Sequence, residues 1–302
     1  MPPAASIEIV EVGPRDGLQN EAAVVSTSDK IALIGRIAAA GIKRIEVASF
    51  VNPSRVPRMA DAEEVANALP MQDGVIYIGL VLNERGADRA LATPLHEIGA
   101  VCVTTDSFAT RNQGQTSDES LAVAKRVVAM ASAAGRRAQI TIAGAFGCPY
   151  DGEVSADRVV AMAQSAAEAG PIEIALADTI GVAVPRQVEL LVSRVAQAIA
   201  PLPVRAHFHN TRNTGVANVW AAVLAGARTV DASLGGLGGC PFAPGAAGNV
   251  PTEDVIYMLE RSGVATGVDL GRLIEAAEWF AQIIGKPLPG MVTRAGRFPR
   301  AA

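Results

Sequence analysis

Short runs of β-branched and apolar residues alternate with helical stretches along most of this chain. The runs with strand character are Ile7–Val12, Arg44–Phe50, Val75–Leu82, Ala100–Thr105, Gln139–Ala145, Glu173–Ala177, Val204–His209 and Thr229–Leu234. Near-continuous apolar strands separated by helices are typical of a parallel sheet buried on both faces. Eight such units predict an α/β fold, the closed (β/α)8 TIM barrel, which usually needs about 250 residues.

The chain has 302 residues, and the excess over a barrel predicts a short C-terminal helical extension. We expect one catalytic domain over residues 1–302, with the barrel at about 6–262 and the extension and tail at about 263–302. Apolar residues recur on one side of Pro185–Ala200, behind a proline suited to a first helical turn. Leu270–Ile284 also has amphipathic helical spacing, and the tail beyond it is either packed on the barrel or loose.

Composition excludes several classes of protein. Hydrophobic residues make up 50% of the chain and charged residues 19%, which predicts a large core. A net charge of −4 indicates no nucleic-acid partner. No apolar run approaches the roughly 20 residues of a membrane span, and the first residues lack the layout of a signal or transit peptide. We therefore expect a cytosolic protein whose three cysteines are free thiols.

His207 and His209 are one residue apart in a predicted strand, so both side chains point to the same face. Taken alone, such a pair is as compatible with two histidines of the core or the surface as with two metal ligands. At the same barrel mouth we expect a carboxylate, Asp16, and an amide oxygen, Asn249. Two imidazoles and two oxygens leave positions open in an octahedral shell, which favours Mg²⁺ or Mn²⁺ over a tetrahedral zinc site.

Polar residues gather where the predicted strands end, which is where barrels of this kind carry their active sites. The residues at or just beyond such ends are Arg15, Asp16, Glu46, Ser49, Asp178, His207, His209 and Cys240. Arg15 and Asp16 are either a surface ion pair or part of a tight turn that fixes their geometry. An arginine held there can stabilise an enolate oxygen, and Glu46 either orients it or forms an ion pair of the fold.

A glycine-rich segment from Gly235 to Asn249 contains six glycines and carries Cys240 at its centre. It matches neither common phosphate-binding glycine motif, so we interpret it as a mobile flap that holds a thiol over the pocket. The remaining cysteines, Cys102 and Cys148, have the surroundings of structural residues, as does His96 at the entry of a strand.

Several of these runs together resemble one known family. The runs that carry the resemblance are VEVGPRDGLQNE, IEVASFVNPSRVPRMAD, FGCPYDG, LADTIGV, HFHN and GGLGGCPFAPGAAGN. In this order they resemble the 3-hydroxy-3-methylglutaryl-CoA lyases, part of a metal-dependent lyase and Claisen-type synthase superfamily built on the TIM barrel.

The resemblance implies a role for individual residues. A divalent cation would be held by Asp16, His207, His209 and Asn249. The residues implied in catalysis are Arg15, Asp16, Glu46 and Cys240, and those implied in substrate binding are Gln19, Ser49, Asp178, Arg111 and Asn112. Ser107, Arg111 and Asn112 are candidate contacts for coenzyme A, although their segment fits a solvated loop equally well.

The implied reaction is retro-Claisen cleavage of a 3-hydroxyacyl-CoA thioester into acetyl-CoA and acetoacetate. Alternatives are cleavage of another thioester such as citramalyl-CoA, which gives pyruvate, and the reverse, condensing reaction. Members of the family commonly have Asp-Thr-Tyr-Gly after the second histidine, whereas this chain has Asn210, Thr211, Arg212 and Asn213. We expect this difference to reshape the acyl pocket, and we expect a homo-oligomer, either a dimer or a tetramer.

Overall fold

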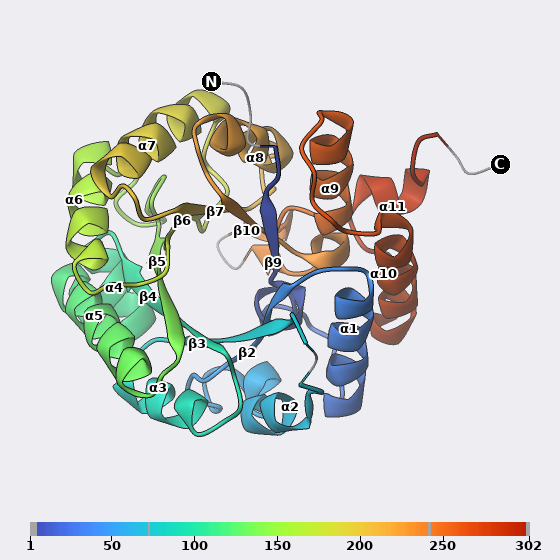
Figure 1. Ribbon diagram of the computed structural model, residues 1–302, viewed down its shortest axis with the longest axis horizontal. Coiled ribbons are helices and arrows are strands. Elements are labelled where there is room, and N and C mark those ends of the chain that lie inside the picture. The colour runs from blue at the N-terminus through green and yellow to red at the C-terminus, as the bar shows by residue number, and fades with distance from the viewer. Residues whose placement is uncertain (1–4, 72, 241–242, 300–302) are drawn as a thin grey trace.

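The fold is a parallel β-barrel surrounded by helices (Figure 1). The computed structural model describes residues 5–71, 73–240 and 243–299. The barrel strands are β1 Glu8–Glu11, β2 Arg44–Ser49, β3 Ile76–Val81, β4 Glu97–Val103, β5 Arg137–Ala143, β6 Ile174–Asp178, β7 Val204–Phe208 and β8 Thr229–Ala232. Each strand pairs in parallel with the next, and β8 pairs with β1 to close the ring. The predicted (β/α)8 barrel is confirmed.

Each predicted strand overlaps one barrel strand, but the bounds of β4 were wrong. The strand begins at Glu97, whereas the apolar pattern places its start at residue 100. Glu97 is fully buried because its carboxylate accepts a hydrogen bond from the Arg44 guanidinium inside the barrel. A search for apolar runs does not include a charged residue that a distant partner neutralises. The predicted strand therefore begins three residues after the observed one.

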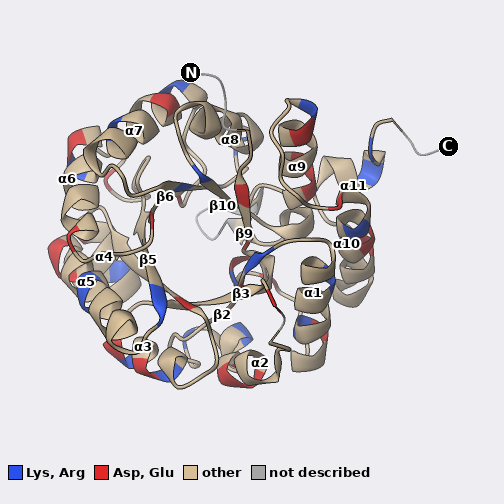
Figure 2. Ribbon diagram, in the orientation of Figure 1, with Lys and Arg blue, Asp and Glu red and all other residues tan. Residues whose placement is uncertain are grey.

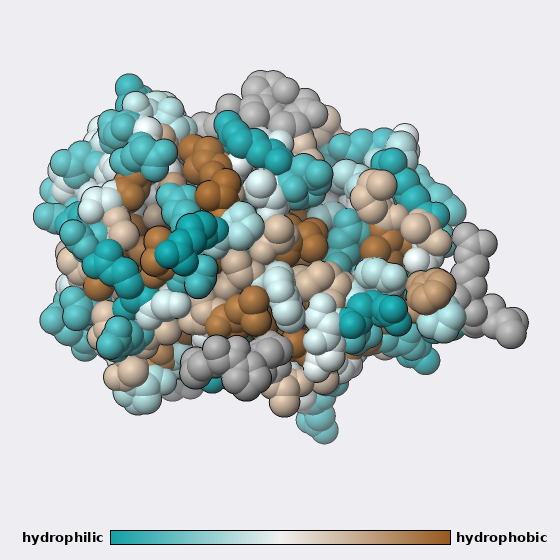
Figure 3. Space-filling view, turned by 90° about the horizontal axis from the view of Figure 1, so that it is seen from above, coloured by the Kyte–Doolittle hydropathy of each residue, from teal (hydrophilic) through white to brown (hydrophobic). Residues whose placement is uncertain are grey.

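Helices cover the outside of the barrel. Those of the ring are α1 Thr27–Ala39, α2 Ala62–Ala68, α3 Glu84–Leu91, α4 Asp106–Gln113, α5 Ser117–Ala133, α6 Ala156–Ala167, α7 Pro185–Ala198, α8 Gly215–Leu224 and α9 Thr252–Arg261. Their outer sides are mainly polar, and hydrophobic residues on the face in Figure 3 form separate groups among hydrophilic ones. Among the described residues, no helix combines the length and apolar character that crossing a bilayer requires.

The C-terminal extension packs on one side of the ring. Helix α10, Leu270–Ile284, lies beside α1 and matches the predicted helix, and the short α11, Met291–Ala295, follows it (Figure 1). Backbone N–H groups of Met291 and Val292 donate hydrogen bonds to the Asp254 carboxylate on α9. Within the described residues, the tail is therefore packed on the barrel and not loose.

Charged residues occur on the barrel strands as well as on the outer helices (Figure 2). Near the N-terminal ends of the strands, Arg44 donates hydrogen bonds to Glu8, Glu97 and Glu173. The opposite charge of Arg44 offsets part of the cost of burying these carboxylates, although burial still raises the pKa of Glu97. This cluster closes one end of the barrel, which leaves the opposite end for ligands.

Three short helical turns follow the C-terminal ends of β1, β2 and β8. The π-helical turn η1 spans Gly13–Gly17, the 3-10 turn η2 spans Pro57–Met59, and the 3-10 turn η3 spans Leu234–Gly236. After η3, β9 Gly239–Cys240 and β10 Ala243–Ala247 form an antiparallel pair. The glycine-rich segment thus contains a short ribbon that follows a 3-10 turn.

The base of the glycine-rich segment is tightly packed. A Cβ at Gly235 would lie 2.3 Å from Leu288 Cδ1, and Gly235 also has a positive φ of 60°. A Cβ at Gly17 would lie 2.7 Å from Leu237 Cβ, so η1 and this base meet almost backbone to backbone. Glycine is required at these two positions for close approach.

Two buried carboxylates support this base, and their protonation should make stability depend on pH. Glu253 accepts hydrogen bonds from the Gly235 N–H, and burial raises its pKa from 4.5 to about 8. Burial also raises the pKa of Glu11 to about 7. Between pH 4.5 and these raised pKa values, each carboxyl group is protonated in the native state but ionised in the unfolded chain. The free energy of unfolding therefore falls as pH rises through this range.

Replacing Glu253 with Gln should remove its share of this pH dependence. The amide oxygen can still accept from Gly235, but it does not titrate. The free energy of unfolding of the native chain relative to Glu253→Gln should therefore fall between about pH 5.5 and about pH 7.5, by up to ~1.4 kcal/mol per pH unit. Denaturant unfolding of both proteins across this range measures the difference. A constant difference would show that Glu253 does not carry a proton in the native state.

Candidate active site

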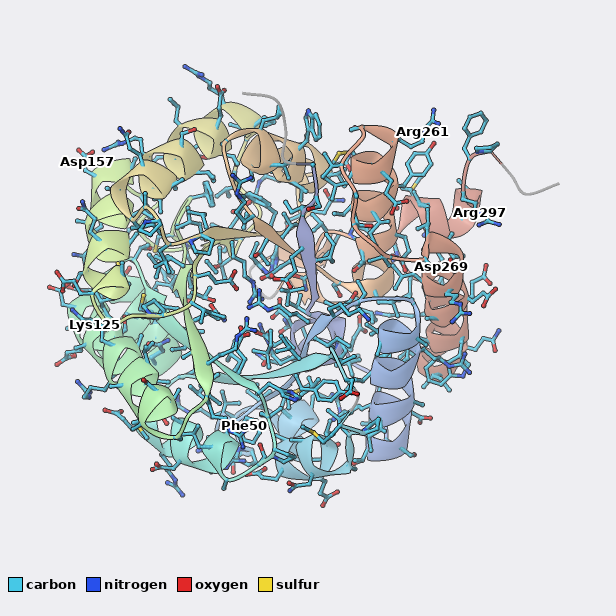
Figure 4. The ribbon with its side chains drawn as sticks, in the orientation of Figure 1. Phe50, Lys125, Asp157, Arg261, Asp269 and Arg297 are labelled. Carbon is cyan, nitrogen blue, oxygen red and sulfur yellow. The ribbon has the colours of Figure 1, made fainter. Side chains whose placement is uncertain are left out.

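A cavity of about 730 Å³ lies at the C-terminal ends of the barrel strands. Its lining includes these residues predicted for the site: Arg15, Asp16, Gln19, Glu46, Ser49, Asn112, His207 and His209. Side chains of the strands point into the barrel centre in Figure 4, whereas Phe50, directly after β2, lies outside the barrel. The alternation along β2 therefore turns Ser49 inward, and the irregular register between Glu46 and Ala48 keeps Glu46 on the same side.

The turn η1 carries Arg15 and Asp16 into this cavity. The backbone N–H groups of Arg15, Asp16 and Gly17 all point to the carbonyl oxygen of Val12, at 3.1, 2.7 and 3.3 Å. Pro14 sits in the first turn, where its missing N–H costs nothing. The sequence GPRDG thus folds into one rigid turn, and the two charged side chains leave it toward the strand ends.

Asp16 lies next to both histidines. Its Oδ2 is 3.8 Å from His207 Nε2 and 3.9 Å from His209 Nε2. One ligand atom from each of the three side chains lies within 4.8 Å of the others, a spacing that can hold a metal ion. The structure therefore brings together three of the residues that the sequence predicts as metal ligands.

The protonation states of Asp16 and His209 also suit a metal. Burial opposes the charged form of His207, but the hydrogen bond to Asp231 outweighs it and raises the pKa of that imidazole. Burial alone would raise the pKa of Asp16, but Arg15 and the two imidazoles lower it to about 2. Burial and the neighbouring His207 lower the pKa of His209 to about 4. At neutral pH Asp16 is therefore an ionised carboxylate and His209 a neutral imidazole, which are the forms that bind metal ions.

Asn249 completes the group. A backbone bridge joins it to His209, and its Nδ2 donates a hydrogen bond to the Leu237 carbonyl oxygen at 3.3 Å. Its Oδ1 is buried and has no hydrogen-bond partner among the described residues. Because a buried amide oxygen without a partner is costly, a hard divalent cation fits this position.

Arg15 joins this group to the barrel wall. Its Nη1 donates to Asp16 Oδ1 at 2.6 Å, and its Nε donates to Glu46 Oε1. Burial opposes the charge of Arg15, but Asp16 and Glu46 outweigh it and raise the pKa of the guanidinium. The arginine is thus a fixed positive charge beside the three candidate ligands.

Comparison with known proteins identifies the family. A family model described as HMGL-like matches residues 6–279. The chain belongs to the HMGL-like family. It is 43% identical to an (R)-citramalyl-CoA lyase from Chloroflexus aurantiacus, covering 96% of this chain and 95% of that protein. It is 39% identical to a hydroxymethylglutaryl-CoA lyase from Bacillus subtilis, covering 96% of this chain and 97% of that protein.

Solved structures of the HMGL-like family have the same fold. The HMG-CoA lyase from Bacillus subtilis superposes with a TM-score of 0.94 at 39% identity, covering 98% of this chain and 99% of that one. An HMG-CoA lyase from Acinetobacter baumannii, in complex with coenzyme A and 3-methylmalate, gives a TM-score of 0.93 at 39% identity. That match covers 99% of this chain and 97% of the other.

Not every predicted site residue of this HMGL-like chain lies at the cavity. Both carboxylate oxygens of Asp178 accept N–H groups of the loop after β6, from Val182 at 2.9 Å and Ala183 at 3.0 Å. Asp178 therefore holds that loop and is not among the residues that line the cavity. Arg111 is exposed, lies over the Tyr150 ring and does not line the cavity either.

The three cysteines also differ in how the structure bears on their predicted roles. The side chain of Cys240, predicted as catalytic, lies outside the part of the chain that the structure describes. Cys102 is buried in the core, as predicted. Cys148 is also buried, and its Sγ accepts hydrogen bonds from the N–H groups of Tyr150 and Asp151, which supports a structural role.

Asn210 and Arg212, predicted to reshape the acyl pocket of this HMGL-like chain, instead fix loops. Asn210 Oδ1 accepts the Gly215 N–H at the start of α8. Arg212 donates to the carbonyl oxygens of Ile180 and Gly181 and ties the loop after β7 to the loop after β6. Neither residue lines the cavity. Any effect of this departure on substrate choice must therefore act indirectly, through the positions of these loops.

The sequence reasoning missed Arg205 and Asp231, which also line the cavity. Arg205 lies two residues before His207 on β7, so the alternation that pairs the histidines places Arg205 on the same face. Asp231 lies on β8 just before the glycine-rich segment. Both are charged residues within short apolar strands, and that contrast was the signal available in the sequence.

Proposed function

We propose that this HMGL-like chain is a divalent-metal-dependent carbon–carbon lyase that cleaves 3-hydroxy-3-methylglutaryl-CoA into acetyl-CoA and acetoacetate. The observation that carries the proposal is the grouping of Asp16, His207 and His209 beside the Arg15 guanidinium in one cavity. Metal ligands next to a fixed cation are what cleavage of a hydroxylated thioester to an enolate requires.

The residues that would hold the cation are Asp16, His207, His209 and Asn249. When bound, Mg²⁺ or Mn²⁺ supplies Lewis acidity that lowers the pKa of the substrate's tertiary hydroxyl group. Imidazole, carboxylate and amide donors suit either ion and leave room for substrate oxygens.

The chain's own residues would carry the proton and the developing charge. A base, for which Asp16 is the candidate, takes the hydroxyl proton, and the bond between C2 and C3 of the acyl group then breaks. Arg15, held by Glu46, stabilises the oxygen of the acetyl-CoA enolate, and the Cys240 thiol returns a proton to its carbon. Gln19, Ser49 and Asn112 line the cavity and are proposed to contact the acyl-CoA.

A second substrate is favoured by the 43% identity to a citramalyl-CoA lyase. Citramalyl-CoA has the same tertiary hydroxyl and methyl groups, but its terminal carboxylate is one methylene group closer. The same residues would cleave it into acetyl-CoA and pyruvate.

A substrate panel tests the proposal. Purified protein with Mg²⁺ or Mn²⁺ is incubated with methylglutaryl and citramalyl thioesters, while acetyl-CoA and the free oxoacid are measured. We expect metal-dependent cleavage of at least one thioester, with no cleavage after chelation. Cleavage that persists in chelator, or no cleavage of either thioester, contradicts the proposal. Incubating acetyl-CoA with the oxoacids tests the condensing direction.

We also propose that the protein is a homo-oligomer and that it is located in the cytosol. Light scattering coupled to size-exclusion chromatography measures the first, and cell fractionation measures the second.

A further inference from the structure

The two histidines of the site differ in what holds their rings. His207 Nδ1 lies 3.0 Å from Asp231 Oδ2, whereas His209 Nδ1 is buried and has no hydrogen-bond partner among the described residues. Both Nε2 atoms face Asp16. One imidazole is therefore fixed from behind by a carboxylate, and the other is not.

Asp231 is itself held in place. Its Oδ1 accepts a hydrogen bond from Arg205 Nε, and Arg205 lies 3.5 Å from Glu173 in the ionic cluster of the barrel. Both residues are almost completely buried, and β7 and β8 are neighbours in register, with Ala206 opposite Val230. The position of the carboxylate is thus set by the barrel itself.

We propose that Asp231, held by Arg205, is a positioning residue that fixes the tautomer and the ring orientation of His207. A carboxylate paired with a guanidinium only accepts hydrogen bonds, so His207 Nδ1 must carry the proton. The Nε2 lone pair then points toward Asp16, where a cation would lie. This inference rests on the proposed metal-dependent function.

The proposal makes the two ligands unequal. The ring orientation and tautomer of His207 are fixed before a metal binds, whereas His209 can change tautomer or ring orientation when the ion binds. A group that is hydrogen-bonded to the other ring nitrogen of a metal-binding histidine contributes roughly 10–100-fold to metal affinity. An asparagine at position 231 can instead offer its amide N–H to Nδ1, which favours the tautomer whose Nε2 is protonated and unable to bind metal.

The test compares Asp231→Asn with Glu97→Gln in the full chain after metal removal. Glu97 is an equally buried carboxylate that pairs with Arg44 and contacts neither histidine. Calorimetric titration with Mn²⁺ should show roughly 10–100-fold weaker binding for Asp231→Asn. Affinity should remain within about threefold for Glu97→Gln. Equal Mn²⁺ affinity for Asp231→Asn and the native chain overturns the proposal.

A second measurement needs no variant to fold. In the native, metal-free chain labelled with ¹⁵N-histidine, long-range proton–nitrogen spectra at about pH 8 should show His207 protonated at Nδ1. A ring that is protonated at Nε2 and not at Nδ1 overturns the proposal. Neither measurement uses a thioester. A chain that binds Mn²⁺ as expected but cleaves no substrate would contradict the proposed function and leave this inference standing.

Discussion

Replacing His207 or His209 with alanine is expected to weaken metal binding strongly and to abolish thioester cleavage while the barrel remains folded. Each substitution removes one of the two nitrogen ligands and leaves three of the four proposed protein ligands, namely the other histidine, Asp16 and Asn249. Metal-ion catalysis contributes several kcal/mol, so kcat should fall by at least roughly 10³-fold. Mn²⁺ titration, steady-state kinetics and circular dichroism measure the three quantities.

The third histidine provides the matched control for these variants. His96 Nδ1 accepts the Tyr77 N–H at 3.1 Å just before β4, at the opposite end of the barrel from the cavity. His96→Ala should lower stability by about 1 kcal/mol and leave metal affinity and kcat unchanged. Unaltered Mn²⁺ affinity in both His207→Ala and His209→Ala would disprove the metal assignment.

Replacing Arg15 with lysine should slow cleavage by roughly 10²–10³-fold with little change in metal affinity. The guanidinium contacts Asp16 and Glu46 at the same time, through different nitrogens. A lysine ammonium keeps the charge but is a point donor that cannot span both carboxylates. The positive charge would then no longer be fixed where the enolate oxygen develops, and kcat should fall more than KM rises.

Arg89 provides the control for the loss of a paired guanidinium. It binds both carboxylate oxygens of Glu63 on the outer ring, at 2.6 and 3.0 Å. Arg89→Lys should alter stability slightly and kcat not at all, because neither Arg89 nor Glu63 lines the cavity. If Arg15→Lys kept the native kcat, Arg15 would serve only to hold η1, and another group would have to stabilise the enolate.

The sequence alone determined the fold class and the main elements of the site. Buried parallel strands need nearly continuous apolar residues, so a barrel is written in its strands before any contact is known. His207 and His209 were paired correctly because the two-residue period of a strand is a local property. Gly13 and Gly17 around Arg15 and Asp16 likewise marked a tight turn, which η1 confirms.

Only the tertiary structure decided which charged residues work together. Glu97 begins β4 because Arg44, distant in sequence, neutralises it. Asp231 reaches His207 because β8 lies beside β7, and Asp178 leaves the cavity because the loop after β6 turns back to its carboxylate. Strand periodicity says which way a side chain points, whereas the partner that meets it depends on barrel closure and loop paths, which no local pattern encodes.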